Sequence, residues 1–247
     1  MLKLISHIGA YGMLMRRVFS KPEKWKVYRR RIIEEMDNLG VSSLGLVILL
    51  SLFMGAVICL QTATNIDSPL IPMSLVGYAT RESVILELSP TMLCLILAGK
   101  VGSSIASEIG SMRVTEQIDA LDIMGVNSAS YLILPKLIAA LVFFPFLIII
   151  SMVLGIVGGY IVSVGTGILE TQDYISGIHM EFKIFHVIYA LIKTLFFAAI
   201  IVSVSAYNGY NVKGGALQVG KSSTQGVVSS SVLILIFNYL LTQVMLI

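Results

Sequence analysis

Charged side chains are scarce in this sequence of 247 residues. Asp, Glu, Lys and Arg make up only 13% of it, whereas 56% is hydrophobic; a typical soluble domain is about 25% charged. Because so few charges cannot cover so much apolar surface in water, the composition indicates a protein of the lipid bilayer. The formal net charge of +3 is also too small to favour a nucleic-acid partner.

Residues that carry enzyme or metal chemistry are equally few. The two cysteines, Cys59 and Cys94, lie within apolar runs and form no Cys-x-x-Cys or Cys/His spacing, so we interpret them as small buried hydrophobic residues. The three histidines, His7, His179 and His186, belong to no Ser/His/Asp or His-Glu-x-x-His pattern. We therefore expect no catalytic residue, no metal site, no bound cofactor and no nucleotide-binding P-loop in this chain.

Long apolar runs are what the sequence has in abundance. Five of them have the roughly 20 residues that a helix needs to cross about 30 Å of hydrocarbon; they lie near 41–61, 84–105, 132–164, 187–207 and 227–247. Backbone groups in lipid must hydrogen-bond within their own segment, so these runs are predicted to be helices. The third run exceeds one span, and tilt or a kink at Pro145 would absorb the excess.

The basic residues predict how these spans are oriented. Nine precede the first span: Lys3, Arg16, Arg17, Lys21, Lys24, Lys26, Arg29, Arg30 and Arg31. Because Lys and Arg are enriched in cytoplasmic segments, the N-terminus is predicted to be cytoplasmic and the C-terminus periplasmic. The second and fourth loops between spans are then cytoplasmic.

The first 40 residues are basic and amphipathic. Apolar residues recur at helical spacing, and Pro22 begins a second piece; the apolar positions are Leu2, Ile5, Ile8, Met15, Val18 and Phe19. A basic amphipathic helix of this kind favours a position in the plane of the membrane interface. A soluble cytoplasmic arm is the alternative.

The segment EIGSMRVTEQIDALDIMG, residues 108–125, lies between the second and third apolar runs and is rich in charge. A helix is predicted over 114–124, in which Val114, Ile118 and Leu121 share one face. Glu116, Asp119 and Asp122 follow at three-residue spacing. An element this short and acidic either docks onto another protein or packs on its own bundle, and periodicity alone leaves both open.

The same segment resembles the signature region of the MlaE/YrbE family, the permease subunits of bacterial lipid ABC transporters. The matching residues are Glu108, Gly110, Met112, Arg113, Thr115, Glu116, Gln117, Ala120, Met124, Val126 and Asn127. The sequence departs from the family pattern at Ser128, where the pattern has proline. The resemblance extends over most of residues 80–247.

The resemblance implies an all-α integral membrane protein, with an N-terminal interfacial helix over 1–40 and a five-span permease domain over 41–247. It implies that the cytoplasmic helix at about 108–125 couples to a separate ATPase subunit, which would use the ATP and Mg²⁺. The coupling residues expected on this basis are Glu108, Arg113, Glu116, Ile118, Asp119, Leu121 and Asp122.

The function implied is movement of phospholipid or a related lipid between the bacterial inner membrane and a periplasmic MCE-type carrier, for outer-membrane lipid homeostasis. A homodimer of permeases, a periplasmic MCE-domain protein and a cytoplasmic STAS-domain subunit are the further partners that it suggests. A stand-alone secondary transporter or channel, and an intramembrane enzyme, are the alternatives from other classes.

Three positions within the spans stand out. A carboxylate within a span is costly and therefore suggests a function for Glu87, with an interfacial Glu that reaches water as the alternative. The resemblance implies that Glu87, with Pro90 after it, lies near the lipid cavity. Similar permeases often have arginine where this chain has Leu86. Lys193, in the fourth run, is predicted to extend to the outer interface, with binding of lipid phosphate as the alternative. Gly155 and Gly159 predict close helix packing.

Overall fold

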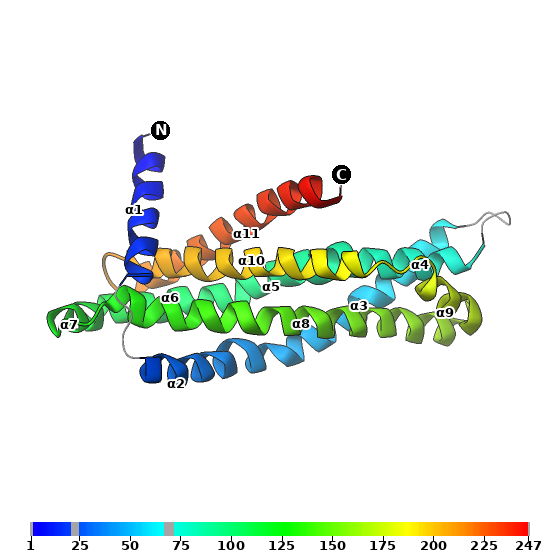
Figure 1. The fold of residues 1–247 in the computed structure, drawn as a ribbon, viewed down its shortest axis with the longest axis horizontal. Helices are drawn as coiled ribbons and strands as arrows, with labels where there is room; N and C mark the ends of the chain where they lie inside the picture. Colours follow the sequence, from blue (N-terminus) through cyan, green and yellow to red (C-terminus); the bar gives the residue numbers. More distant parts are fainter. Residues whose placement is uncertain (1, 21–24, 67–71, 247) are drawn as a thin grey trace. The chain divides into compact units, whose positions relative to one another are not determined.

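The fold consists of helices, which Figure 1 labels in chain order. The computed structural model describes residues 2–20, 25–66 and 72–246, and within these it contains no strand. Five helical stretches are long and apolar enough to span a membrane: Tyr28–Asn65, Ser74–Val114, Ser128–Thr166, Ile184–Tyr210 and Ala216–Leu246. The prediction of five spans in an all-α membrane protein is confirmed.

The first span begins earlier than predicted. Helix α2 (Trp25–Glu35) continues through a π-helical turn, η1 (Met36–Val41), into α3 (Ser42–Asn65). The helix therefore has no break near residue 40, where the boundary of the permease domain is predicted, and a separate first helix, α1 (Leu2–Val18), precedes it. Pro22, the predicted start of the second piece, lies outside the described residues, as do the side chains of Leu2 and Ile5.

The second span is one helical path of several segments. It comprises α4 (Ser74–Ser83), η2 (Val84–Met92), α5 (Leu93–Leu97), η3 (Ala98–Gly102) and α6 (Ser103–Val114). Pro90 lies inside the π-helical η2. Proline has no N–H to donate to the carbonyl four residues earlier and its ring collides with that carbonyl, and a π-helical turn accommodates such a disruption.

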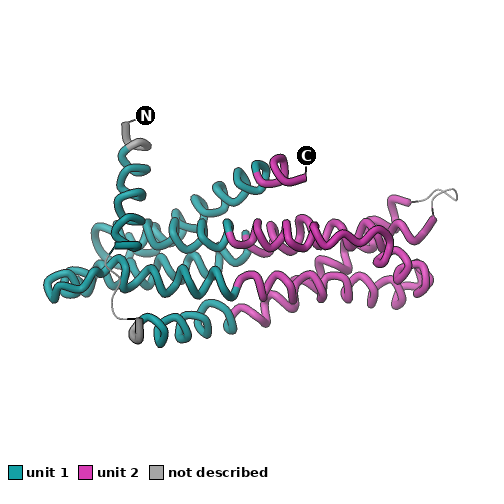
Figure 2. Tube along the Cα trace, in the orientation of Figure 1, with its two compact units in different colours: residues 1–42, 95–143, 196–240 teal, residues 43–94, 144–195, 241–247 magenta. Residues whose placement is uncertain are grey.

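The remaining helices complete the chain: α7 (Gln117–Ile123), α8 (Ser128–Thr166), α9 (Thr171–His179), α10 (Ile184–Tyr210) and α11 (Ala216–Leu246). Helix α8 has 39 residues, or roughly 58 Å at 1.5 Å per residue, and it stays helical through Pro145. The chain divides into two compact units, which Figure 2 distinguishes by colour: unit 1 has residues 1–42, 95–143 and 196–240, and unit 2 has 43–94, 144–195 and 241–247.

Glycines allow helices of unit 2 to approach closely. A Cβ on Gly55 of α3 would lie 1.8 Å from the backbone oxygen of Gly155 in α8, and one on Gly158 would lie 2.2 Å from Leu52 O. A Cβ on Gly159 would lie 2.3 Å from the Tyr174 hydroxyl. The predicted close packing at Gly155 and Gly159 is confirmed, and Gly55 is the partner that the spacing did not identify.

Helix α9 covers α4 in unit 2. The Tyr174 hydroxyl donates to Ile156 O at 2.9 Å, and burial raises the pKa of this hydroxyl, which therefore remains a neutral donor. Arg81, only 1% exposed, donates to Ile178 O at 2.6 Å and Met180 O at 2.7 Å. One buried guanidinium thereby holds the end of α9 against α4.

Candidate functional site

The segment between α6 and α7 turns sharply instead of continuing as one helix. Helix α6 ends at Val114, and Glu116 has a left-handed backbone with φ 59°. A non-glycine residue rarely adopts this conformation, and here it separates the axes of two helices. The predicted continuous helix over 114–124 is therefore wrong: Val114 and Ile118 belong to different helices, and Glu116 precedes α7.

Helix α7 also ends with a defined motif. Gly125 has φ 79°, and its N–H bonds Asp122 O at 3.1 Å, while Val126 N–H bonds Leu121 O at 3.1 Å. This pair of bonds closes the C-terminus of a helix and favours glycine at the left-handed position. A seven-residue helix is thus fixed at both ends, which an isolated helix of that length would not achieve.

The apolar face of α7 lies against the chain itself. Ile118 is completely buried and Leu121 is half-buried, so Ile118 supports α7 from within unit 1 and presents no surface to a partner. The exposed apolar residues are instead Ile123 and Met124, at 87% and 68% exposure. The predicted apolar face ends at Leu121, so the periodicity did not identify these two residues, which follow it in the sequence. We call Ile123 and Met124 the α7 tip.

Hydrogen bonds and ion pairs hold helix α7, which carries the α7 tip, in place within unit 1. Arg113 Nη1 lies 2.6 Å from Asp119 Oδ1. Asp122 Oδ1 accepts from Ser128 Oγ at 2.7 Å, and Ser128 Oγ lies 2.8 Å from the Tyr210 hydroxyl. These contacts tie α7 to α6, to the start of α8 and to the end of α10. Ser128, at the position where the sequence departs from the family pattern, is part of the bracing.

Helix α7 and the connection after it are also tied to the end of α1 and to Ser20, which follows α1. Asn127 Nδ2 donates to Arg17 O at 2.8 Å and to Ser20 O at 2.7 Å, and Asp122 Oδ2 lies 3.7 Å from Arg17 Nη2. Arg113, Asp119 and Asp122, which are among the expected coupling residues, therefore form ion pairs or hydrogen bonds inside the chain. Glu116 is exposed and has no ion pair among the described residues.

Glu108 belongs to a charge cluster inside unit 1 and not to α7. Lys136 of α8 is 2% exposed and lies 2.6 Å from Glu35 Oε1 and 2.7 Å from Glu108 Oε2. One ammonium therefore joins α2, α6 and α8. Glu108 is half exposed and pairs with Lys136, and its coupling role stays a prediction.

Replacing Lys136 by Met should lower the free energy of unfolding by about 3 kcal/mol. Breaking a buried ion pair typically costs about 3–5 kcal/mol because a charge remains unpaired, and the lower value applies since Glu108 is half exposed. Thermal unfolding of the detergent-solubilised chain measures it, with Lys183→Met, at an exposed lysine, as control. Equal stability of the two variants would contradict the cluster.

The second candidate site, in unit 2, centres on Glu87. Its Oε1 lies 2.8 Å from Lys193 Nζ, and Thr91 Oγ1 donates to its Oε2 at 2.9 Å. Lys193 is fully buried, whereas 44% of the Glu87 side chain is exposed. The expectation that Lys193 extends to the interface is therefore wrong, and Glu87 has a charged partner although Leu86 replaces the arginine.

Pro90 acts on this site through the backbone. Because Pro90 has no N–H, it cannot bond Leu86 O, four residues earlier, and Lys193 Nζ donates to that oxygen at 3.2 Å. Pro90 itself is buried, and its predicted place in the lipid cavity stays a prediction. Lys193 also lies 4.6 Å from the centre of the Tyr189 ring, which favours a cation over its face.

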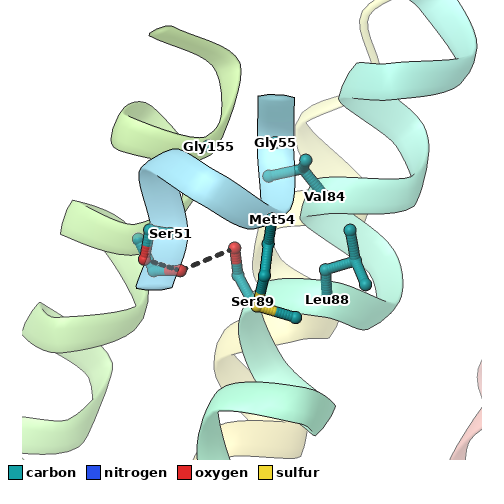
Figure 3. Close-up of a pocket in the computed structure, with 8 residues that line it drawn as sticks. Ser51, Met54, Gly55, Val84, Leu88, Ser89 and Gly155 are labelled. Carbon is teal, nitrogen blue, oxygen red and sulfur yellow. Dashed lines mark hydrogen bonds between the residues drawn. The ribbon is translucent and has the colours of Figure 1, made fainter. Parts of the chain in front are cut away.

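A row of serines lies in unit 2, as Figure 3 shows. Ser51 Oγ lies 2.9 Å from Ser151 Oγ, which lies 3.0 Å from Ser89 Oγ. They border a cavity of about 10 Å³, which is scarcely room for one water molecule. Between apolar helices, such hydroxyl contacts hold α3, η2 and α8 together.

A formal match to the P-loop pattern Gly-x-x-x-x-Gly-Lys-Ser occurs at residues 215–222, contrary to the expectation that the chain has none. Gly215 lies directly before α11, the other matched residues form the beginning of that helix, and the described residues contain no strand before it. A P-loop cradles phosphates with a loop between a strand and a helix, so this helical segment does not provide one. In the described part of the chain, no group of three or more His, Cys, Asp or Glu side chains is placed to hold a metal ion.

Comparison with known proteins identifies the family. The family model described as Permease MlaE matches residues 32–244. A "Probable ABC transporter permease protein" of Rickettsia bellii is 37% identical over 242 residues, which cover 98% of this chain and 93% of that protein. The "Intermembrane phospholipid transport system permease protein MlaE" of Haemophilus influenzae is 30% identical over 240 residues, covering 96% and 91%. With five membrane-spanning helices and this match over most of its length, the chain belongs to the MlaE family of ABC transporter permeases.

Proposed function

We propose that this permease subunit, a multi-pass protein of the inner membrane, moves phospholipid between that membrane and a periplasmic MCE-domain carrier. A relative with matching length is named as the permease of an intermembrane phospholipid transport system, which supports phospholipid as the substrate. A separate cytoplasmic ATPase subunit, using ATP and Mg²⁺, would supply the energy. A second copy of the permease and a STAS-domain subunit complete the proposed assembly.

The observation that carries this proposal is the braced and exposed α7 tip. A motor subunit that moves must act on a part of the permease that does not bend locally. Helix α7 is held by contacts to α6 and to Ser128 of α8, and Ser128 in turn contacts Tyr210 of α10. Its exposed Ile123 and Met124 are suited to an apolar groove on the ATPase. Glu116 and Asp119, both exposed, would border that contact, while buried Ile118 and half-buried Leu121 position it.

The conformational change driven by the ATPase would have to affect the proposed lipid site at Glu87. Helix α6 belongs to the same continuous span as η2, which carries Glu87. A conformational change driven by the ATPase would have to change the surroundings of Glu87. Transport requires that the affinity for lipid differ between the two states, and the half-exposed Glu87 carboxylate is the proposed polar contact for a lipid headgroup.

The α7 tip can be tested by replacing Ile123 and Met124 together with serine. Burial of a large apolar side chain contributes about 2 kcal/mol, and a factor of ten in affinity corresponds to about 1.4 kcal/mol. The double variant should therefore retain less than a tenth of the ATPase that co-purifies with the native chain. Mass spectrometry of complexes extracted in mild detergent gives the ATPase-to-permease ratio.

The matched control is Ile184→Ser. Ile184 is 68% exposed and begins α10, whose opposite end contacts Ser128 through Tyr210. This control should keep its full complement of ATPase. If the double variant also kept it, α7 would not be the coupling element; if the native chain purified without any ATPase, the transporter assembly itself would be wrong.

A further inference from the structure

A groove of about 800 Å³ lies in unit 1 and is lined by α1, α10 and α11. Its position is distinct from the Glu87–Lys193 pair, which belongs to unit 2. The size falls within the range of about 300–1,000 Å³ that is typical of small-molecule sites. None of the functional residues discussed above lines it.

One end of the groove is polar and basic. Lys213 follows α10, and Lys221 lies in the first turns of α11, together with Gln218 and Gln225. Within the described ranges, neither lysine has a carboxylate within ion-pair distance. Two ammonium groups therefore face the groove without a counter-ion from the described part of the chain.

The helices that line the groove contain no acidic residue. Residues 1–20 and 184–247, which contain α1, α10 and α11, include no Asp and no Glu. Elsewhere in the described chain, buried lysines are paired, as Lys136 and Lys193 are. Because both of these ranges lack acids, the charge of the groove favours an anion.

The other end of the groove is apolar. Val204 of α10 and Leu233 and Phe237 of α11 line it, with Ile8 of α1. From Lys221 to Phe237 the helix advances 16 residues, which is roughly 24 Å. A single phospholipid spans about half of a bilayer whose full thickness is about 40–45 Å, so the charged and apolar ends are separated by about one lipid length.

Helix α1 is anchored as a wall of this groove. His7 Nδ1 lies 2.9 Å from the Tyr207 hydroxyl, and the Tyr11 hydroxyl donates to Ser203 Oγ at 2.8 Å. The ring of Tyr207 also makes edge contacts with the rings of His7 and Tyr11. A polar and aromatic contact thus holds α1 beside α10 within unit 1, and the groove is a formed feature of the fold.

We propose that this groove binds one anionic phospholipid, with its phosphate at Lys213 and Lys221 and an acyl chain along Val204, Leu233 and Phe237. Basic residues attract anionic lipid headgroups, and the apolar end supplies a slot for hydrocarbon. The polar side chains Gln218 and Gln225 can donate hydrogen bonds to phosphate or ester oxygens. The site shares no residue with Glu87, the proposed contact for the transport cargo, or with its ion-pair partner Lys193.

A second copy of the chain is the competing occupant, and the charges disfavour it. In a two-fold contact the same surface faces itself, so α1, α10 and α11 of one copy would meet those of the other. No carboxylate from these helices would then neutralise Lys213 and Lys221. A phosphate group supplies that charge directly.

The test uses the full chain in nanodiscs that contain photoreactive phosphatidylglycerol, with the reactive group on the acyl chain. After illumination, mass spectrometry measures labelling of the α11 peptide that contains Leu233 and Phe237. The variant Lys213→Gln with Lys221→Gln should reduce this labelling about tenfold. The charge-conserving variant with Arg at both positions should retain it, as should Lys183→Gln, whose lysine is exposed but lies in unit 2.

Four outcomes would overturn the proposal. Equal labelling by photoreactive phosphatidylcholine would show an apolar slot without anion selectivity, and unchanged labelling in the Gln variant would exclude the two lysines. Loss of labelling on adding inorganic phosphate or ATP would assign the basic end to a soluble phosphate. Disulfide cross-linking between copies through Gln225→Cys, with no lipid label on that peptide, would assign the groove to a second copy.

Discussion

Replacing Gly55 by Ala should reduce the free energy of unfolding by at least about 2 kcal/mol. The added methyl group would lie 1.8 Å from Gly155 O and 2.5 Å from Gly155 C, which are backbone atoms of α8. Because a backbone cannot move aside as a flexible side chain does, α3 and α8 would have to separate. Overpacking of an interior typically costs about 1–3 kcal/mol and sometimes more, which exceeds the gain of up to about 1 kcal/mol from the better helix propensity of alanine.

Gly45→Ala is the matched control, because Gly45 lies on the same helix and a Cβ there would have no atom within 4 Å. This control should be as stable as the native chain or slightly more stable. The comparison is made by thermal unfolding in one detergent, together with the yield of monodisperse protein. A Gly55→Ala variant that matched Gly45→Ala would show that α3 and α8 are not in contact at Gly155.

The spans could be predicted from the sequence because their cause is local. A run of about 20 apolar residues is committed to a helix by the solvent that surrounds it, whatever the rest of the chain does. The first span begins earlier than predicted because the basic helix α2 continues as a helix into α3. A helix ends where its backbone hydrogen bonds end, and polar residues can continue these bonds beyond the apolar run. The hydropathy of the sequence does not predict this position.

The resemblance to the family singled out residues 108–125, which we propose as the coupling segment, but it did not predict the internal structure of this segment. The spacing of Val114, Ile118 and Leu121 assumes one helix, whereas the left-handed Glu116 interrupts it. Glutamate gives no local signal for that conformation, unlike glycine. The Gly125 that ends α7 does follow the rule for helix C-termini. The turn at Glu116 determines that Ile123 and Met124 are the exposed apolar residues. The sequence pattern alone does not predict their exposure.

The pair of Glu87 and Lys193 was missed for a different reason. The two residues are 106 positions apart, so no periodicity connects them, and each taken alone is a charge in a span. The prediction for Lys193 assumed that a lone lysine seeks water. A neighbouring carboxylate changes that balance, because moving the ammonium to the interface would break its ion pair with Glu87.

Neutralising Glu87 should destabilise the chain more than removing Lys193. In Glu87→Gln, the fully buried Lys193 loses its counter-ion, and a buried charge without a partner costs about 3–5 kcal/mol. In Lys193→Met, the remaining Glu87 is 44% exposed and can contact water, so the loss should be about 1–2 kcal/mol, from the missing bonds to Glu87 and to Leu86 O. Thermal unfolding of both variants in the same detergent gives the order.

The double variant, which carries Glu87→Gln together with Lys193→Met, separates the charge pair from simple packing. An uncharged amide then replaces the carboxylate and methionine fills the space of the lysine, so no buried charge remains; replacement of a buried ion pair by apolar groups is often close to neutral. Stability of the double variant should therefore exceed that of Glu87→Gln alone by about 2 kcal/mol or more. Additive losses would mean that the two residues act independently, as distant sites do, and that the ion pair does not stabilise this part of the permease.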